Sequence, residues 1–286
     1  MQFILAGLFA GYASWLTLRG GIPWAFGDNF LSTLLNCGIF SSIFLGLMVA
    51  LPPLLNEFQP RKALHLFAPA AATGLALPMT TAVIFSWIGD MIDITRIMPY
   101  YLHRSVWWLV FSFSIAASRA ILVGNRESFP RNLLGLIPGI LLPGLLSDAF
   151  FAPRGNFFWG SMILGISTGA GLAMSLELLK DAWLEEFSSS PLHAQYLLES
   201  DEFVAGSSED CDLTLSAYSS HSFSIVEKDG LHVLEAIDEY PVIINNGRFK
   251  YRILVEGDAI RIDNKTWIYH SRYARTRDAM PEAATY

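Results

Sequence analysis

The first 180 residues of this chain contain six apolar runs, each of about 18 residues or more, the length that a helix needs to cross a bilayer. A segment that crosses lipid must satisfy its own backbone polar groups, so these runs predict α-helices. Charged residues, glycine or proline bound every run, which predicts about six transmembrane helices. The runs are Met1–Leu18, Phe30–Leu55, Leu64–Ile88, Ser105–Val123, Asn132–Phe151 and Phe157–Leu179.

Composition divides the chain into two parts. Only 16% of the residues are charged and 52% are hydrophobic, whereas about a quarter of the residues of a soluble domain are charged. Residues 1–180 hold ten Lys/Arg and seven Asp/Glu, a net charge of +3. Residues 181–286 hold nine Lys/Arg and nineteen Asp/Glu, a net charge of −10. We therefore predict a transmembrane helical domain at 1–180 and a polar domain after it.

The distribution of basic residues predicts the orientation. With a cytoplasmic N-terminus, six basic residues lie at the inner side and four at the outer side, and the positive-inside rule favours this arrangement. Both termini are then cytoplasmic, in agreement with an even number of spans. The inner group is Arg61, Lys62, Arg119, Arg126, Arg131 and Lys180, and the outer group is Arg19, Arg96, Arg104 and Arg154.

Small residues recur at a spacing of four in three of the runs, as in helices whose backbones approach closely in lipid. This pattern predicts a compact bundle and a possible homo-oligomer through the same faces. A conduction path is the alternative, and its candidate residues are Arg119 and Asp148, two ionisable groups that lie near the ends of the spans. The small residues are Gly7 and Gly11, then Gly135 and Gly139, then Ser161, Gly165, Gly169 and Ala173.

The hydrophobic periodicity changes to two after residue 192, which predicts an all-β sandwich at 193–273, joined by a linker at 181–192 and followed by a disordered tail at 274–286. Three hairpins are expected, because turn residues separate pairs of short alternating segments. The pairs are Phe223–Val226 with Leu231–Leu234, Val242–Ile244 with Tyr251–Leu254, and Ala259–Ile262 with Thr266–Tyr269.

The order of motifs in residues 183–273 resembles that of a forkhead-associated (FHA) domain. The stretch Asp212–Leu215 matches the family's D-[IL]-x-L strand, His221 its loop histidine, and Asn246-Gly247 its later turn. The stretch Leu254–Ile260, with the sequence LVEGDAI, matches the closing L-x-x-G-D-x-I motif. The helical half is similar to that of bacterial membrane-anchored FHA proteins, in which a segment resembling Leu178–Leu184 precedes the domain. The resemblance implies an FHA-like (SMAD/FHA-type) β-sandwich.

The resemblance also implies a phosphothreonine-peptide site at one end of the sandwich, but its anchors are absent. The family's arginine after glycine is replaced at Ala205-Gly206, its loop serine at Tyr218, and its Asn-Gly-Thr at Pro241–Ile243. A phosphate dianion requires a guanidinium fork and fixed donors. We therefore expect a degenerate domain that binds an unphosphorylated or basic protein partner. The candidate partner-binding residues are Ser207, Ser208, Tyr218, Ser219, Ser220, Asn245 and Asn246, with His221 as a structural brace of the loop.

The remaining expectations concern function as a whole. No nucleophile, phosphate-loop, zinc-protease or dinucleotide motif appears, so we expect no enzyme, no cofactor, no metal and no nucleic acid. The expected function is that of an inner-membrane scaffold or adaptor in signalling, with the lipid bilayer and a cytoplasmic protein as its partners. Two alternatives remain open: a channel or transporter subunit regulated by the β-domain, and a phosphothreonine-dependent signalling receptor.

Overall fold

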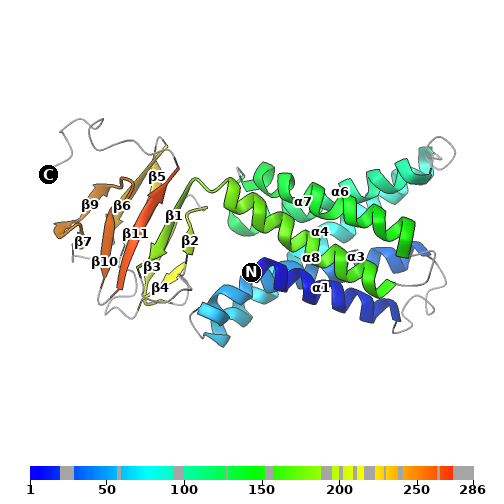
Figure 1. Ribbon diagram of the computed structural model, residues 1–286, viewed down its shortest axis with the longest axis horizontal. Coiled ribbons are helices and arrows are strands. Elements are labelled where there is room, and N and C mark those ends of the chain that lie inside the picture. The colour runs from blue at the N-terminus through cyan, green and yellow to red at the C-terminus, as the bar shows by residue number, and fades with distance from the viewer. Residues whose placement is uncertain are drawn as a thin grey trace. The chain divides into compact units, whose positions relative to one another are not determined.

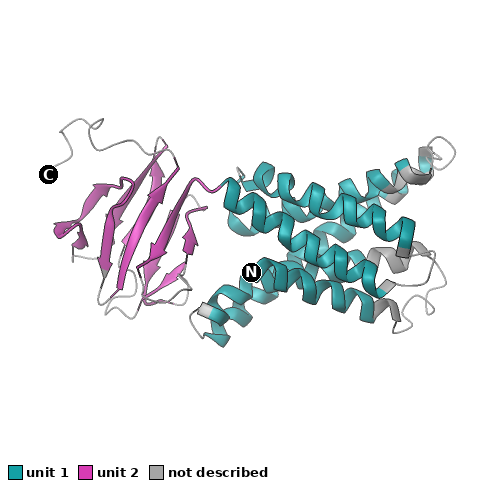
Figure 2. Cartoon of the chain, viewed as in Figure 1, with its two compact units in different colours: residues 1–179 teal, residues 180–286 magenta. Residues whose placement is uncertain are grey.

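The protein forms two compact units, Met1–Leu179 and Lys180–Tyr286, as Figure 2 shows. The computed structural model describes most of the chain. The described residues are 1–19, 29–56, 59–92, 100–126, 128–151, 157–187, 195–199, 202–208, 211–215, 223–228, 230–237, 241–262 and 265–272.

The first unit is entirely helical in its described part, and each helix corresponds to one of the predicted apolar runs (Figure 1). The elements are α1 (Gln2–Arg19), α3 (Asn29–Asn56), α4 (Pro60–Ile92), α6 (Tyr100–Val123), α7 (Ser128–Leu146), the π-helical turn η1 (Ser147–Phe151) and α8 (Phe157–Leu178). Five of these helices contain segments long and apolar enough to cross a membrane, and Gln2–Leu16 is a shorter apolar helix.

Helix α8 packs closely against two other helices through small residues. A Cβ atom at Gly165 would overlap the carbonyl oxygen of Gly7 in α1, and one at Gly169 would overlap that of Phe3. The predicted strip that contains Gly165 and Gly169 therefore packs against α1 of the same chain. Such contacts stabilise helix pairs in lipid, where association gains little from the hydrophobic effect.

A second strip on α8, which the sequence did not reveal, packs against α7. A Cβ atom at Gly135 would overlap the carbonyl oxygen of Gly171, and one at Gly139 would lie 2.7 Å from the carbonyl oxygen of Ser167. The residues Ser167 and Gly171 follow the same spacing of four as the first strip. Helix α8 thus contacts α1 and α7 through two different small-residue strips.

The second unit is a sandwich of two β-sheets, which confirms the predicted fold class of an apolar helical part followed by an all-β part. Sheet A has the strand order β2-β1-β11-β10-β7-β8, and sheet B the order β4-β3-β5-β6-β9. The strands are β1 (Ala182–Glu186), β2 (Gln195–Leu197), β3 (Glu202–Gly206), β4 (Leu213–Thr214), β5 (Phe223–Lys228), β6 (Leu231–Ala236), β7 (Val242–Ile244), β8 (Gly247–Phe249), β9 (Tyr251–Ile253), β10 (Ala259–Ile262) and β11 (Lys265–Ser271).

Apolar side chains from both sheets form one core between them. Every second residue of a strand points inward, which explains the alternating burial in the sequence. The largest contributions come from aromatic side chains, with Trp267 and Tyr269 of sheet A facing Phe203 and Phe223 of sheet B, all of them buried.

The structure confirms two of the predicted hairpins and corrects the third. Strands β5 and β6 pair antiparallel, as do β10 and β11. However, Val242–Ile244 pairs with Gly247–Phe249 and not with the predicted Tyr251–Leu254. The chain changes sheets at Lys250, and Tyr251–Ile253 pairs with β6 of sheet B.

The interval 181–192, predicted as a linker, contains strand β1. This strand pairs with β11 and β2, so Ala182–Glu186 lies inside sheet A. The predicted disordered tail at 274–286 lies outside the described residues.

Candidate functional site

Strand directions place several connections at one end of the sandwich, which we call the loop end. Strand β3 pairs parallel with β4 and antiparallel with β5, and β5 pairs antiparallel with β6. The connections that follow β3, β4 and β6 therefore leave the sandwich at the same end. Its described residues include Gly206, Ser207, Ser208 and Asp212.

The predicted partner-binding residues do not all gather at the loop end. Ser207 is exposed and Ser208 half-buried there. Asn245 and Asn246 form the turn after β7, at the opposite end, because β7 begins at the loop end and runs away from it. The other predicted residues, Tyr218, Ser219, Ser220 and His221, lie outside the described part of the chain.

A carboxylate contacts the backbone at the loop end. The Asp212 side chain accepts a hydrogen bond of 2.9 Å from the backbone N–H of Val204 in β3. The backbone N–H of Leu215 donates to the carbonyl of Gly206 at 2.6 Å, and Cys211 donates to Ser208 at 3.2 Å. From the sequence, Asp212 was identified only as a motif position. It is eight residues from Val204, and no local pattern indicates that the two residues are in contact.

Strands β3 and β4 and their connections contain acidic residues but no Lys or Arg. No Lys or Arg occurs in the sequence between Lys180 and Lys228, so neither β3 nor β4 nor their connections contain a permanent cation. An anion near Gly206 would therefore approach the carboxylate of Asp212 without a compensating guanidinium or ammonium from β3, β4 or their connections. Like charges disfavour such an approach.

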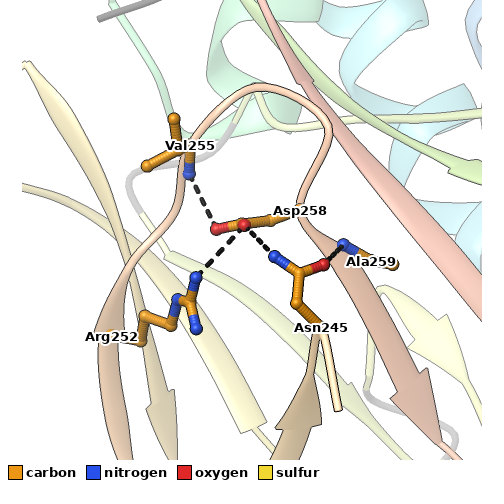
Figure 3. Close-up of polar contacts among 5 residues, drawn as sticks. All are labelled: Asn245, Arg252, Val255, Asp258 and Ala259. Carbon is orange, nitrogen blue, oxygen red and sulfur yellow. Dashed lines mark hydrogen bonds and ion pairs between the residues drawn. The ribbon is translucent and has the colours of Figure 1, made fainter. Parts of the chain in front are cut away.

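The opposite end contains a buried polar network around Asp258, shown in Figure 3. The Asp258 carboxylate, 4% exposed, accepts hydrogen bonds from the Asn245 side chain at 2.5 Å, the Val255 backbone at 3.0 Å and the Arg252 guanidinium at 3.3 Å. The Asn245 side-chain oxygen accepts from the backbone N–H of Ala259 at 2.9 Å. The side-chain nitrogen and oxygen of Asn245 are thus both hydrogen-bonded to residues of the fold, which gives the network a structural role.

A second polar contact joins the two sheets. The Tyr269 hydroxyl lies 2.9 Å from Nδ1 of His232. Burial lowers the pKa of His232 below its usual value. Burial also raises the pKa of Tyr269 to about 12, and a hydrogen bond with Ser271 acts in the opposite direction. Both side chains are therefore uncharged at neutral pH.

The two polar residues considered for conduction bind separate partners in the helical unit. The Arg119 guanidinium donates a hydrogen bond to the Asn132 side chain, which joins α6 and α7. The Asp148 carboxylate in η1 accepts a hydrogen bond of 2.8 Å from the indole N–H of Trp108. In the described residues, no three His, Cys, Asp or Glu side chains are grouped as metal ligands.

No protein-family model matches the sequence, and no curated protein matches it. An FHA domain solved in a study of phosphothreonine-dependent interactions is 19% identical, covers 32% of this chain and 95% of that chain, and has a TM-score of 0.29. The FHA domain of CT664 from Chlamydia trachomatis is 16% identical, covers 32% and 97%, and has a TM-score of 0.29. EmbR from Mycobacterium tuberculosis, solved with a low-affinity phosphopeptide, is 15% identical over 94% of this chain and 70% of that chain, with a TM-score of 0.30. The solved structures similar to this chain thus include FHA domains, the family that its sequence motifs resemble.

Proposed function

We propose that this protein is a membrane-anchored scaffold or adaptor that recruits a partner protein to the loop end of its β-sandwich, without the phosphothreonine recognition of the FHA family. The helices provide the anchor, and the sandwich provides a recognition surface. The observation that carries the proposal is the absence of Lys and Arg from the sequence between Lys180 and Lys228, combined with the carboxylate of Asp212, which precedes β4 and is hydrogen-bonded to β3.

This chemistry disfavours a phosphorylated ligand and favours a basic or neutral one. Phosphate recognition in proteins depends on charge-assisted hydrogen bonds, most often from arginine. In the described residues of the connection from β3 to β4, the polar groups are the hydroxyls of Ser207 and Ser208, the carboxylate of Asp212 and backbone atoms. Hydroxyls and backbone groups suit a peptide main chain, and a carboxylate suits a lysine or arginine side chain of the partner.

The position of tryptophans supports the membrane anchor. Trp87 near the C-terminal end of α4 and Trp159 near the N-terminal end of α8 are 64% and 54% exposed. Trp15, near the end of α1, packs against Phe158 with ring centroids 5.0 Å apart. These tryptophans lie at one end of the antiparallel helices, as in the aromatic belts of membrane proteins. The inner-side basic residues favour both termini in the cytoplasm, and an inner-membrane location is part of this proposal.

Site-specific photo-crosslinking tests the proposed recognition end in cells. A photoreactive amino acid replaces Ser207 at the loop end in the full chain, and a matched variant carries it at Asn246 at the opposite end. We expect a protein adduct from position 207 that is absent, or at least tenfold weaker, at position 246. Equal adducts at both positions, or none at either, would contradict recruitment through the loop end.

A further inference from the structure

Two arginines and an isoleucine form a row across the outer face of sheet A. Arg261 of β10 is opposite Ile243 of β7, and Ile243 is opposite Arg248 of β8. Residues directly opposite each other on neighbouring strands point to the same face. Their neighbours in the strands, Ile244 and Ile260, are completely buried in the core. The row therefore faces away from the core.

The two arginines of this row are exposed. Within the described residues, neither Arg248 nor Arg261 takes part in an ion pair or side-chain hydrogen bond. Other cations of the unit are neutralised, in the pairs Lys228–Glu235, Arg252–Asp258 and Lys265–Glu186. Uncompensated arginines are notable in a segment whose sequence has far more acidic than basic residues.

The rest of this face combines aromatic, apolar and charged groups, and it includes Glu185, which is opposite Ile268 and lies 3.6 Å from His270. Glu256 also contacts His270, at 2.8 Å. The Trp183 ring stacks on His270 with centroids 5.0 Å apart, and the Lys180 ammonium lies 4.0 Å from the centre of the Trp183 ring. Ile268 is half-buried between them and the arginine row, and Phe187, just beyond β1, is 73% exposed. Tryptophan, lysine and arginine, with apolar side chains between them, are the residues that bind the interface between water and lipid.

The outer face of sheet B differs in charge. Register places Glu235 beside Ser224 and Val204 on that face, and Glu202 lies in the same strand as Val204. The cation of this face, Lys228, is paired with Glu235. In the described strands of sheet B, no unpaired Lys or Arg points outward. In the described strands, the outer face of sheet A thus has two unpaired arginines, whereas the outer face of sheet B has no unpaired Lys or Arg.

We propose that the outer face of sheet A binds the anionic headgroups of a lipid surface, with Arg248 and Arg261 contacting phosphates. This inference goes beyond the proposed function and holds whether or not a partner protein is recruited. Charge complementarity favours this face, because Arg248 and Arg261 are unpaired within the described residues, whereas Lys228 on the outer face of sheet B is paired with Glu235. The tether supports it: α8 ends at Leu178 and β1 begins at Ala182, and three intervening residues reach only about 10 Å.

The short tether makes weak contacts effective, because it holds the sandwich beside any membrane that α8 crosses and so raises the effective concentration. Each basic side chain near an anionic surface favours binding about fivefold. Two arginines are therefore expected to favour the lipid-bound state about 30-fold over a neutral surface. Added salt weakens this preference, because exposed charges are screened within about 8 Å at physiological ionic strength.

Fluorescence quenching in nanodiscs tests the proposal on the full chain. A cysteine replaces Ile243 on the outer face of sheet A, and a matched variant has Val204→Cys on the outer face of sheet B. Both native cysteines are buried, so a maleimide dye labels the introduced cysteine. The discs contain headgroup-spin-labelled lipid, in either an anionic phosphatidylglycerol mixture or pure phosphatidylcholine. A third variant adds Arg248→Glu and Arg261→Glu to Ile243→Cys.

We expect strong quenching at position 243 in anionic discs, and at least threefold less in phosphatidylcholine, at position 204, at high salt, and in the charge-reversed variant. The neutral changes Arg248→Gln and Arg261→Gln are expected to give intermediate quenching. Equal quenching at positions 243 and 204, or quenching that lipid charge and charge reversal leave unchanged, would overturn the proposal. Lipid-independent protection of position 243 from soluble quencher by a cell lysate would instead identify a protein on this face and also overturn it.

Discussion

Asp258 and Asn245 are joined by a hydrogen bond of 2.5 Å from the asparagine side chain to the aspartate carboxylate. The bond ties the turn after β7 to the connection between β9 and β10 (Figure 3). Arg252 and the backbone of Val255 bind the same carboxylate. This buried network holds together strands from both sheets, and it is the most specific structural feature of the LVEGDAI motif.

Asp258→Ala is expected to lower the free energy of unfolding of the β-unit by about 3 kcal/mol, because it removes a buried carboxylate and leaves the partly buried donors of Arg252 and Asn245 unpaired. Urea unfolding of residues 180–286, which have their own core, measures this loss. The control Glu202→Ala, at an exposed position of β3, is expected to change stability by less than about 0.5 kcal/mol. Similar losses for the two variants would contradict a special role for Asp258.

The turn between β7 and β8 requires a left-handed backbone at two residues. The φ angles of Asn245 and Asn246 are 49° and 69°, as in the type I′ turns of two-residue hairpins. Asn246→Ala is expected to cost about 1 kcal/mol, because most L-residues are strained there, whereas Asn246→Gly retains or raises stability. Urea unfolding compares the two variants. Equal losses would show that the asparagine side chain, and not the backbone, stabilises the turn.

Gly165 sets the distance between α1 and α8, since a Cβ at this position overlaps the backbone of Gly7. Gly165→Leu is expected to separate the two helices and to lower the thermal stability of the detergent-solubilised chain, with a cost of about 3 kcal/mol or more from overpacking. Thermal unfolding followed by size-exclusion chromatography measures it. The neighbouring change Ile166→Leu, at a residue 39% exposed, serves as the control and is expected to have little effect.

The burial of His232 and Tyr269 makes the stability of the β-unit depend on pH. The pKa of His232 is lowered in the fold, so the unfolded chain takes up this proton first and stability falls as pH drops below about 6.5. The pKa of Tyr269 is raised to about 12, so its contribution is lost as pH rises from about 10 towards 12. Urea unfolding across pH measures both slopes. We expect His232→Gln to flatten the acidic slope and Tyr269→Phe to flatten the alkaline one.

The sequence predicted the helices well because each apolar run is long enough to be recognised by itself. It also predicted the small strip of Gly165 and Gly169, because their spacing of four is a local pattern. The strip of Ser167 and Gly171 was missed, since its partner Gly135 had already been assigned to a separate motif. A sequence shows which face of a helix carries small residues. Which neighbouring helix packs on that face depends on the arrangement of the whole bundle.

The sandwich was predicted less completely, for reasons of length and distance. Strand β8 has only three residues, Gly247–Phe249, too few to show an alternating pattern, so Tyr251 was assigned to the hairpin in its place. Strand β1 follows α8 so closely that its residues resembled a linker. The candidate residues Asn245 and Asn246 lie at the opposite end from Ser207 and Ser208, which the sequence did not show because a list of motifs gives the order of strands but not their directions. The antiparallel pairing of β7 with β10 shows at which end of the sandwich the turn after β7 lies.

The most direct test of recruitment without phosphothreonine recognition is quantitative co-purification of the full chain from membranes, with and without phosphatase treatment of the extract. We predict a partner that is retained equally in both samples and is lost when Ser207 and Ser208 at the loop end are both changed to glutamate, while Asn246→Gly leaves it bound. A partner that disappears after phosphatase treatment and persists in the double glutamate variant would contradict our proposal.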